Sequence, residues 1–195
     1  MNSSKKLTQE YWNIRYLEGA TGWDMGKVSP PIKGYVDQLE DKTILILIPG
    51  AGNSHEVEYL HRQGFTNVHL LDYAETPMKL FCDRNPDFPK KHVHIEDLFT
   101  HEGRYDLILE QTLFCAINPI LRQKYADKVS DLLAENGKLV GVLFGYKFEE
   151  GPPFGGTRDE YLSYFSSLFR GIEMNPCYNS IEPRSGKELF INLEK

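Results

Sequence analysis

The chain has 195 residues, of which 41% are hydrophobic and 26% are charged, and this is typical of a globular protein with a single domain. Its net charge of −6 argues against nucleic acid or an anionic membrane as a partner, because both require a basic face. No apolar run approaches the length of a membrane span, and residues 1–12 lack the apolar core of a signal peptide. We therefore expect a cytoplasmic protein.

The metal-binding residue types give no recognisable pattern. The three cysteines, Cys82, Cys115 and Cys177, are an odd number without metal-type spacing, which favours a reducing compartment and no disulfide framework. His92 and His94 alternate as residues do on the solvated face of a strand. The sequence thus predicts no metal site.

The pattern of apolar residues predicts helices and strands along the whole chain. Helices are expected at 5–18 and 31–40, before the first strand. From 43 to 144, strands and helices alternate: strand 43–48, helix 54–63 with Ser54 as its cap, strand 67–72, helix 74–84, strands 91–95 and 105–110, helix 120–134, an Asn136-Gly137 turn and strand 138–144. An exposed loop at 149–156, a helix at 158–168 and two strands near 171–177 and 188–193 follow.

The alternation of strands and helices predicts a parallel sheet with helices on both faces. Ligands of such sheets bind outside the carboxyl ends of the strands. The loops after the first four strands should therefore meet at one pocket. They carry Gly50–Asn53, Asp72-Tyr73, Asp97-Leu98 and Glu110-Gln111.

The first strand, its glycine turn and the end of the second strand indicate a pocket for a cofactor that contains a nucleoside. Gly50 and Gly52 would let the backbone approach a bulky ligand, and Asp72 could accept hydrogen bonds from two ribose hydroxyls. Alternatively, the glycines form a plain turn and Asp72 is a solvated acid at a strand end. A nicotinamide-dependent oxidoreductase would share these features, but the third glycine and a Tyr-x-x-x-Lys pair are missing. A nucleoside-binding domain without catalytic activity is a further alternative.

Four segments together resemble the thiopurine S-methyltransferase family of class I S-adenosylmethionine-dependent methyltransferases, and within it the halide and thiol methyltransferase branch. They are WNIRYLEGATGWDMG, IPGAGNSHEV with Asp72 downstream, EQTLFCAINPILRQKYADKVSDLL, and GPPF at 151–154. The similarity runs from about residue 11 to the C-terminus. Tyr16 is a departure, because the halide branch usually has tryptophan there.

The resemblance implies an α/β, Rossmann-like three-layer sandwich with a mostly parallel seven-stranded sheet. Its last strand would be antiparallel, in a hairpin near Pro183–Gly186. Residues 1–195 would form one domain, in which residues 1–40 are a helical lid over the cofactor and residues 41–195 are the catalytic sheet.

The resemblance also implies positions for S-adenosylmethionine. Gly50 and Gly52 would pass close to its amino-acid part, and Asp97 and Leu98 would lie beside the adenine. Residue 111, here Gln111, would contact the methionine part. Glu110 could bind the amino group or face solvent. Aromatic rings of the lid would lie against the sulfonium, as cations are attracted to π systems: Trp12, Tyr16 and Trp23.

We expect an apolar pocket for the methyl acceptor, with Trp23 as its roof. Its walls would be Phe114, Cys115, Tyr146, Pro153 and Phe154. We interpret Cys115 as a small hydrophobe rather than a nucleophile, because no histidine stands in a motif that would activate it. Arg184 could meet an anionic acceptor, whereas Arg122 is expected at the surface.

The expected reaction is the in-line displacement of the methyl group by a small soft nucleophile, such as a thiolate, bisulfide, halide or thiocyanate. A thiol with a pKa near 8.5 is already partly ionised at pH 7, so a general base is not required. The product, S-adenosylhomocysteine, should bind and inhibit. We expect a monomer that acts on a small molecule without a metal.

Overall fold

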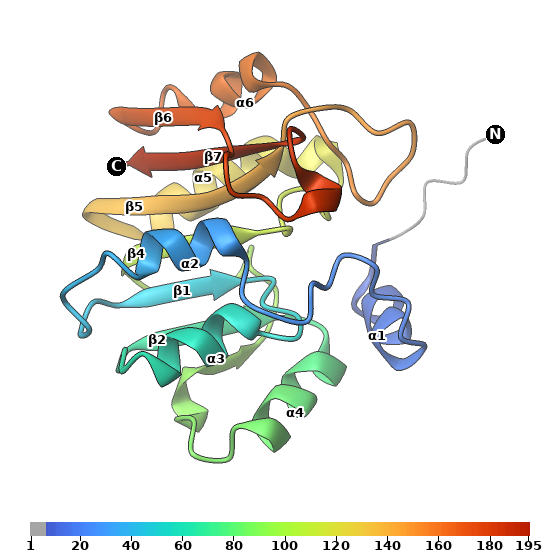
Figure 1. The fold of residues 1–195 in the computed structure, drawn as a ribbon, viewed down its shortest axis with the longest axis vertical. Coiled ribbons are helices and arrows are strands. Elements are labelled where there is room, and N and C mark those ends of the chain that lie inside the picture. Colours follow the sequence, from blue (N-terminus) through green and yellow to red (C-terminus); the bar gives the residue numbers. More distant parts are fainter. Residues whose placement is uncertain (1–6) are drawn as a thin grey trace.

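The computed structural model describes residues 7–195, which form a seven-stranded sheet with helices on both faces (Figure 1). The order of the strands across the sheet is β3-β2-β1-β4-β5-β7-β6, and β7 is antiparallel to both of its neighbours. The strands are β1 (Ile46–Pro49), β2 (Val68–Asp72), β3 (Val93–Ile95), β4 (Tyr105–Gln111), β5 (Leu133–Phe144), β6 (Gly171–Pro176) and β7 (Glu188–Glu194). The predicted fold class is confirmed. The antiparallel strand is last in the chain but lies between β5 and β6 in the sheet.

Helices cover the two faces of the sheet, and one short helix lies beyond the carboxyl ends of its parallel strands. They are α1 (Gln9–Leu17), α2 (Pro30–Val36), α3 (His55–Arg62), α4 (Glu75–Arg84), α5 (Arg122–Leu132) and α6 (Arg158–Phe165). Successive residues of a strand point to opposite faces. Ile46 and Ile48 therefore pack in a core with α2, α3 and α4, while Leu47 packs in a second core with α5 and α6.

The short helix α1 differs from the others because none of its residues is buried. It lies beyond the carboxyl ends of the parallel strands (Figure 1). The helix expected to begin at residue 5 begins at Gln9, and residues 5 and 6 lie outside the described part of the chain. By contrast, α2 packs on the sheet itself through Ile32 and Val36.

Two local predictions were wrong. Asn136-Gly137 does not separate α5 from the next strand, because β5 already begins at Leu133 and the pair forms an irregularity within it. Asn136 takes a left-handed φ of 63°. Ser54 does occupy the cap position of α3, but its hydroxyl donates to the carbonyl of Gly52 instead of capping the helix.

The order of the strands places the switch point between β1 and β4, because the chain proceeds from β1 through β2 to β3 on one side and then returns to β4 and β5 on the other. Two residues beside it, Ser54 and Thr112, have left-handed φ angles of 62° and 64°. Such strained backbone tends to gather at functional sites. Between residues 7 and 195, no helix is both long and apolar enough to cross a bilayer.

Candidate active site

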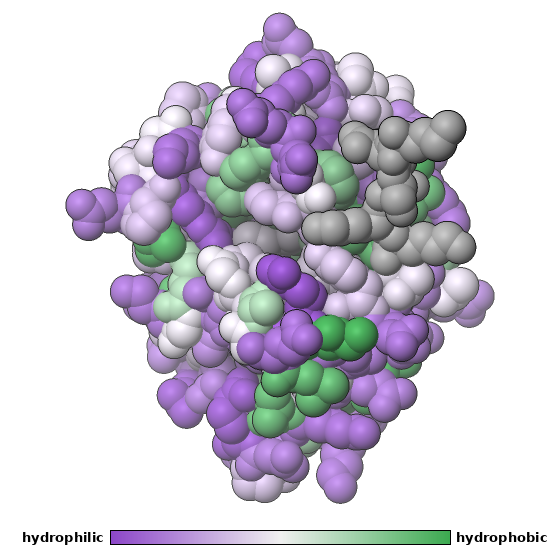
Figure 2. All heavy atoms as spheres, turned by 90° about the vertical axis from the view of Figure 1, so that its right-hand side faces the viewer, coloured by the Kyte–Doolittle hydropathy of each residue, from purple (hydrophilic) through white to green (hydrophobic). Residues whose placement is uncertain are grey.

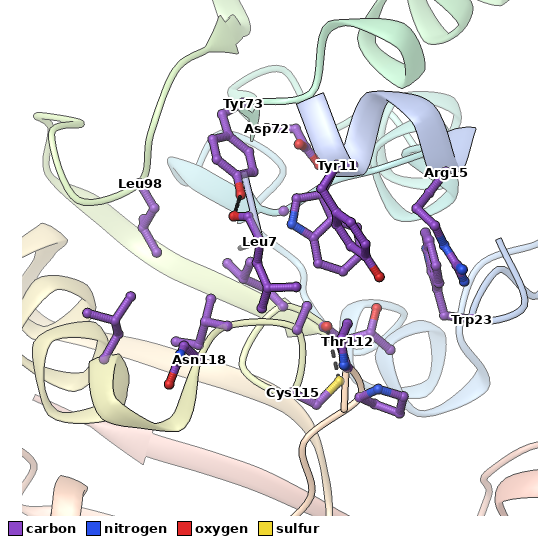
Figure 3. Close-up of a pocket in the computed structure, with 18 of the residues that line it drawn as sticks. Leu7, Tyr11, Arg15, Trp23, Asp72, Tyr73, Leu98, Thr112, Cys115 and Asn118 are labelled. Carbon is purple, nitrogen blue, oxygen red and sulfur yellow. Dashed lines mark hydrogen bonds between the residues drawn. The ribbon is translucent and has the colours of Figure 1, made fainter. Parts of the chain in front are cut away.

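A cavity of about 790 Å³ opens at the carboxyl edge of the sheet. Its walls come from α1 and from the loops that follow β1, β2, β3, β4 and β5, together with the connection that leads into β7 (Figure 3). Figure 2 looks onto this face, where several groups of hydrophobic side chains interrupt a largely hydrophilic surface. The loops predicted to converge are therefore brought together.

Asp72 is held rigidly where β2 ends. Its carboxylate accepts hydrogen bonds from the backbone N–H of Gly52 at 2.9 Å and of Ala74 at 2.8 Å. The side chain lines the cavity and only 8% of the residue is exposed, so burial raises the pKa of its carboxyl. A carboxylate can accept about four hydrogen bonds, so Asp72 retains capacity for two hydroxyl donors.

The glycine turn after β1 leaves no room for side chains. A Cβ at Gly50 would lie 2.8 Å from the side chain of Leu113, and one at Gly52 would lie 2.5 Å from the Tyr16 hydroxyl. Both glycines also have left-handed φ angles, of 62° and 52°. The turn therefore requires glycine at both positions and packs closely against α1 and the loop after β4.

The segment after β3 presents Asp97 and Leu98 to the cavity. Asp97 also caps a turn, since its carboxylate accepts from the backbone N–H of Phe99 at 2.9 Å and its carbonyl accepts from Thr100 and His101. Leu98 is 6% exposed and belongs to the core on the α5 face. Each residue thus has a structural role as well as a place in the cavity wall.

Three aromatic residues of the N-terminal segment meet over the cavity. Trp23 makes edge-to-face contacts with Trp12 and Tyr16, with ring centroids 5.5 Å and 5.8 Å apart. All three line the cavity. The guanidinium of Arg15 lies 5.4 Å from the centre of the Trp23 ring. In Figure 3 it stands on the side of that ring that faces away from Asp72. Arg15 was not predicted, although it stands one helical turn after Trp12.

Asp24 fastens the loop that carries Trp23 to the body of the protein. Its carboxylate accepts from the backbone of Gly26 at 2.7 Å and from the Asn53 side chain, and it lies 2.8 Å from Nε2 of His55. The hydrogen bond with His55 lowers the pKa of Asp24 and raises the pKa of the imidazole. The sequence did not indicate this pairing, because the partners are far apart in the chain.

Gln111 does not line the main cavity but a neighbouring one of about 50 Å³, which also borders Gly52 and Asp24. The residue is 9% exposed, and neither its amide oxygen nor its amide nitrogen has a hydrogen-bond partner among residues 7–195. Unpaired polar atoms in such a position are costly and point to a ligand or solvent partner.

The part of the cavity expected to hold the methyl acceptor differs in part from the predicted set. Trp23, Cys115, Tyr146, Pro153 and Arg184 line it. Phe114 does not, because it is fully buried beneath the site against Tyr125, Tyr161 and Phe165. Phe154 does not either: its backbone N–H donates to the Cys115 carbonyl at 2.6 Å, and its ring lies against Gly151. Three residues that were not predicted complete the wall: Phe144, Phe148 and Pro152.

Cys115 is not equipped as a nucleophile. Its thiol donates to the carbonyl of Thr112 at 3.1 Å, and burial raises the pKa of the thiol well above its usual range (Figure 3). No histidine of the described chain lines the cavity. The side chain therefore acts as a small apolar part of the wall.

Glu110 shapes the loop that follows β4. It is fully buried and accepts from the backbone N–H of Leu113 at 2.8 Å and of Phe114 at 2.9 Å, and from the Tyr125 hydroxyl. Burial raises the pKa of its carboxyl to about 7. Glu110 neither faces solvent nor lines the cavity, so both interpretations of it were wrong.

Arg122 is also buried, at 1% exposure, and not at the surface as expected. Its guanidinium donates to Glu160 at 2.5 Å and to the carbonyls of Phe154 and Gly155 at 2.8 Å and 3.0 Å. It therefore fastens the loop 149–156 to α5 and α6. This loop was expected to be exposed, yet five of its eight residues are half-buried or buried, and its two prolines line the cavity.

Charge is distributed unevenly around the cavity. Acidic side chains line it where β2 and β3 end, and basic side chains line it at α1 and at the connection into β7. The acidic residues are Asp72, Glu96 and Asp97, and the basic residues are Arg15, Arg184 and Lys187. The guanidinium of Arg184 also donates to the Trp23 carbonyl at 2.6 Å, which joins the aromatic cover to the other side of the cavity.

Comparison with known proteins identifies the family. A model of the thiopurine S-methyltransferase family matches residues 7–189. The chain is 29% identical to a probable thiol methyltransferase 2 of Arabidopsis thaliana and to a thiocyanate methyltransferase 1 of Brassica oleracea, over 94% of this chain and 84% of each relative. It is 25% identical to a thiopurine S-methyltransferase of Psychrobacter cryohalolentis, over 86% of this chain and 89% of that protein.

Solved structures agree in fold. The 1,6-didemethyltoxoflavin-N1-methyltransferase of Burkholderia thailandensis superposes with a TM-score of 0.73 at 16% identity, over 97% of this chain and 87% of that one. A TehB-like methyltransferase of Corynebacterium glutamicum has a TM-score of 0.66 at 17% identity, over 96% and 97% of the two chains. Because the family match spans almost the whole described chain, the protein belongs to the thiopurine S-methyltransferase family and is an S-adenosylmethionine-dependent methyltransferase.

Proposed function

We propose that this methyltransferase acts on a small, soft nucleophile and prefers anionic acceptors such as thiolates, bisulfide, halides or thiocyanate. One observation carries the proposal. The end of the cavity around Cys115 is an aromatic and aliphatic cage that includes the guanidinium of Arg184, and no histidine or carboxylate among residues 7–195 lines it. Behind the wall, Arg184 is also paired with the buried carboxylate of Glu188 at 3.4 Å. Such a wall suits a polarisable anion, and it offers no group to take a proton from a neutral alcohol or amine.

The residues at the opposite end fit S-adenosylmethionine. Asp72 has free acceptor capacity for ribose hydroxyls, and the turn at Gly50 and Gly52 cannot hold side chains. The unpaired amide of Gln111 would find partners in the amino-acid part of the cofactor. Asp97 and Leu98 would hold the adenine, and the three lid aromatics would cover the sulfonium.

When bound, the cofactor supplies a methyl group that is already activated by its positive sulfur. The protein's contribution is then to hold the acceptor in line and to exclude water. Positioning of this kind can lower a barrier by roughly 7–11 kcal/mol in favourable cases. No residue of the cage needs to gain or lose a proton.

The cage is built from rings that pack tightly against one another. Phe148 lies 4.5 Å from Tyr146 and 5.0 Å from Phe144, measured between ring centroids. The guanidinium of Arg184 lies 5.7 Å from the centre of the Phe144 ring. A small anion between these groups would lose most of its hydration while keeping one positive neighbour. The names of the relatives, thiol and thiocyanate methyltransferase, describe acceptors of the same chemistry.

The proposal is tested by transfer of a labelled methyl group to iodide, thiocyanate, bisulfide and a thiopurine. We expect turnover of at least one small anion, with a rate for iodide at saturating cofactor that does not vary with pH. Calorimetry should show binding of S-adenosylhomocysteine and none of NAD. Turnover restricted to alcohols or amines would contradict the proposal.

Arg184→Met and Arg184→Lys refine this test, with Arg62→Met on the exposed face of α3 as the matched control. We expect the methionine variant to raise KM for anionic acceptors about tenfold, which corresponds to about 1.4 kcal/mol. Lysine should restore most of the affinity because it restores the charge. Equal loss for anionic and neutral thiols would show that Arg184 only supports the lid.

A further inference from the structure

Four of the six histidines gather on one edge of the sheet, away from the acceptor cage. They come from β2, from the 3-10 turn Lys90–His92, from β3 and from the turn that follows it. The ring of His69 stacks on those of His92 and His94, with centroids 4.1 Å and 5.2 Å apart, and the ring of His94 meets that of His101 edge to face at 4.8 Å. We name His69, His92, His94 and His101 the histidine cluster.

We propose that two members of this cluster, His94 and His101, bind a divalent transition-metal ion together with Glu96. One ligand atom from each of the three side chains lies within 4.8 Å of the other two. A Glu96 oxygen is 2.6 Å from Nδ1 of His101 and 3.9 Å from Nδ1 of His94. Because Glu96 is 43% exposed, its carboxylate can move the short distance needed to complete bonds of about 2.0–2.2 Å.

The second nitrogen of each imidazole already has a partner that would orient the ring toward an ion. Nε2 of His101 lies 2.7 Å from the Tyr105 hydroxyl, and Nε2 of His94 lies 2.9 Å from Nδ1 of His69. Metal-binding histidines almost always use their other nitrogen in this way, which fixes the tautomer and the direction of the ring. The arrangement therefore presents two Nδ1 atoms and one carboxylate toward the same point.

The donor set selects the kind of ion. Two imidazoles and one carboxylate suit Zn²⁺, Co²⁺ or Ni²⁺, whereas Ca²⁺ and Mg²⁺ prefer oxygen ligands alone. β3 is an edge strand, so the site opens to solvent beside Glu96 and a water molecule can complete the coordination. The linear spacing of His92 and His94 did not indicate this site, because His101 and Glu96 join it only through the turn after β3.

Binding here would also act on the main cavity. Glu96 and His101 stand at the two ends of the turn that carries Asp97 and Leu98, and Glu96 itself lines the cavity. An ion held by both ends would restrict this turn and strengthen binding of the adenine portion of the cofactor. This second step rests on the proposed function, whereas ion binding does not.

The first experiment titrates Zn²⁺ into the tag-free protein by calorimetry, with Ca²⁺ as a second arm. We expect saturable binding of about one Zn²⁺ per chain and no Ca²⁺ binding. Glu96→Gln and His94→Asn should each weaken Zn²⁺ binding at least tenfold, with unchanged circular dichroism. His61→Asn is the control, because His61 also faces a carboxylate, that of Asp87 at 3.4 Å, but lies outside the cluster.

Absorption of the Co²⁺-loaded protein identifies the ligands independently. We expect weak visible bands and no thiolate charge-transfer band, because the described cysteines lie outside the cluster. Absence of saturable Zn²⁺ binding, a thiolate band, or wild-type affinity in both variants would overturn the proposal.

The second experiment measures the affinity for S-adenosylhomocysteine with and without Zn²⁺. We expect about a threefold to tenfold gain with Zn²⁺ in the wild type and none in Glu96→Gln. Zn²⁺ binding without this gain would overturn the coupling alone. Failure of S-adenosylhomocysteine to bind under either condition would contradict the proposed function and leave the ion site standing.

Discussion

The two sides of the cavity are built in different ways. The sheet side rests on β1, whose four residues are all buried, and on Asp72, which is fixed by two backbone donors. The opposite side, which we propose as a lid and call the lid side, rests on α1, which has no buried residue. Packing in the core thus holds the groups that would bind the ribose, whereas the groups that cover the cavity bury much less apolar surface.

Instead of packing, the lid depends on a small number of polar contacts. Gln9 donates to the Tyr73 carbonyl at 2.5 Å, and the Asn13 side chain accepts from the backbone of Thr76 at 3.0 Å. The Tyr73 hydroxyl donates to the Leu7 carbonyl at 2.7 Å, and further contacts are made by Asp24 and by Arg184, which donates to the Trp23 carbonyl. A segment of this kind can open without unfolding the sheet, because few apolar contacts are lost. The comparison predicts that changes on the sheet side and on the lid side will affect different measurements.

The largest effect is expected at Asp72. Asp72→Ala removes a charged acceptor for the ribose and leaves the N–H groups of Gly52 and Ala74 unpaired. Hydrogen bonds to charged groups contribute about 1.5–3 kcal/mol, so affinity for S-adenosylhomocysteine should fall at least about 100-fold. Calorimetry checks this, with the exposed Asp83→Ala on α4 as control. A loss below tenfold would show that the rigid side does not dominate cofactor binding.

A second effect concerns stability rather than binding. Glu110→Ala leaves two backbone N–H groups and the Tyr125 hydroxyl without their acceptor in the core, which should cost about 2–4 kcal/mol of unfolding free energy. Glu110→Gln keeps an acceptor and should cost less. Denaturant titration at fixed pH measures both. Equal losses for alanine and glutamine would contradict the role of Glu110 as an acceptor.

The pH dependence of these variants has a definite sign. Burial raises the pKa of Glu110 to about 7, so between its unfolded value near 4.5 and 7 the native state binds more protons. The contribution of this group to stability therefore declines as pH rises through that interval. Glu110→Gln lacks this decline, so its stability relative to the wild type should improve from pH 4.5 to 7.

On the lid side, Asp24→Ala should leave overall stability nearly unchanged, because its partners Asn53 and His55 remain close to solvent. The closed position of the lid should become weaker by about 1 kcal/mol, and S-adenosylhomocysteine should dissociate about fivefold faster. Stopped-flow fluorescence of Trp12 and Trp23 would follow this. A fall in unfolding free energy as large as that of Glu110→Ala would contradict the distinction between the two sides.

The smallest effect is a dependence of lid closure on pH. The hydrogen bond to Asp24 raises the pKa of His55. The protonated imidazole therefore stabilises the closed lid fully below the ordinary pKa near 6.5, and this stabilisation is lost as pH rises through the raised pKa. Affinity for S-adenosylhomocysteine should therefore decrease about twofold to threefold from pH 6.5 to 8.5. Binding measured across this range checks it. The decrease should disappear in His55→Asn, and persistence there would assign it to another group.

Local pattern was sufficient for the architecture and for one side of the cavity. Apolar runs, the turn at Gly50 and Gly52, and the acid at position 72 are encoded by neighbouring residues. The rule that parallel strands end at one edge then brought Asp72, Asp97 and Leu98 to one cavity. The family resemblance added the three aromatic residues Trp12, Tyr16 and Trp23, which line the same cavity.

Contacts between distant residues had to be seen in three dimensions. Phe114 points into the core while Phe144 and Phe148 reach the cavity, because the direction of a side chain in a loop or at the end of a strand depends on the surrounding packing. Arg122 is buried since Glu160 and two carbonyls satisfy its charge from another helix and loop. Asp24 pairs with His55, and the histidine cluster forms, between segments that lie far apart in the chain. No regular spacing in the sequence predicts either contact. Short-range periodicity records which face a residue occupies, but only the folded chain decides which distant side chains meet there.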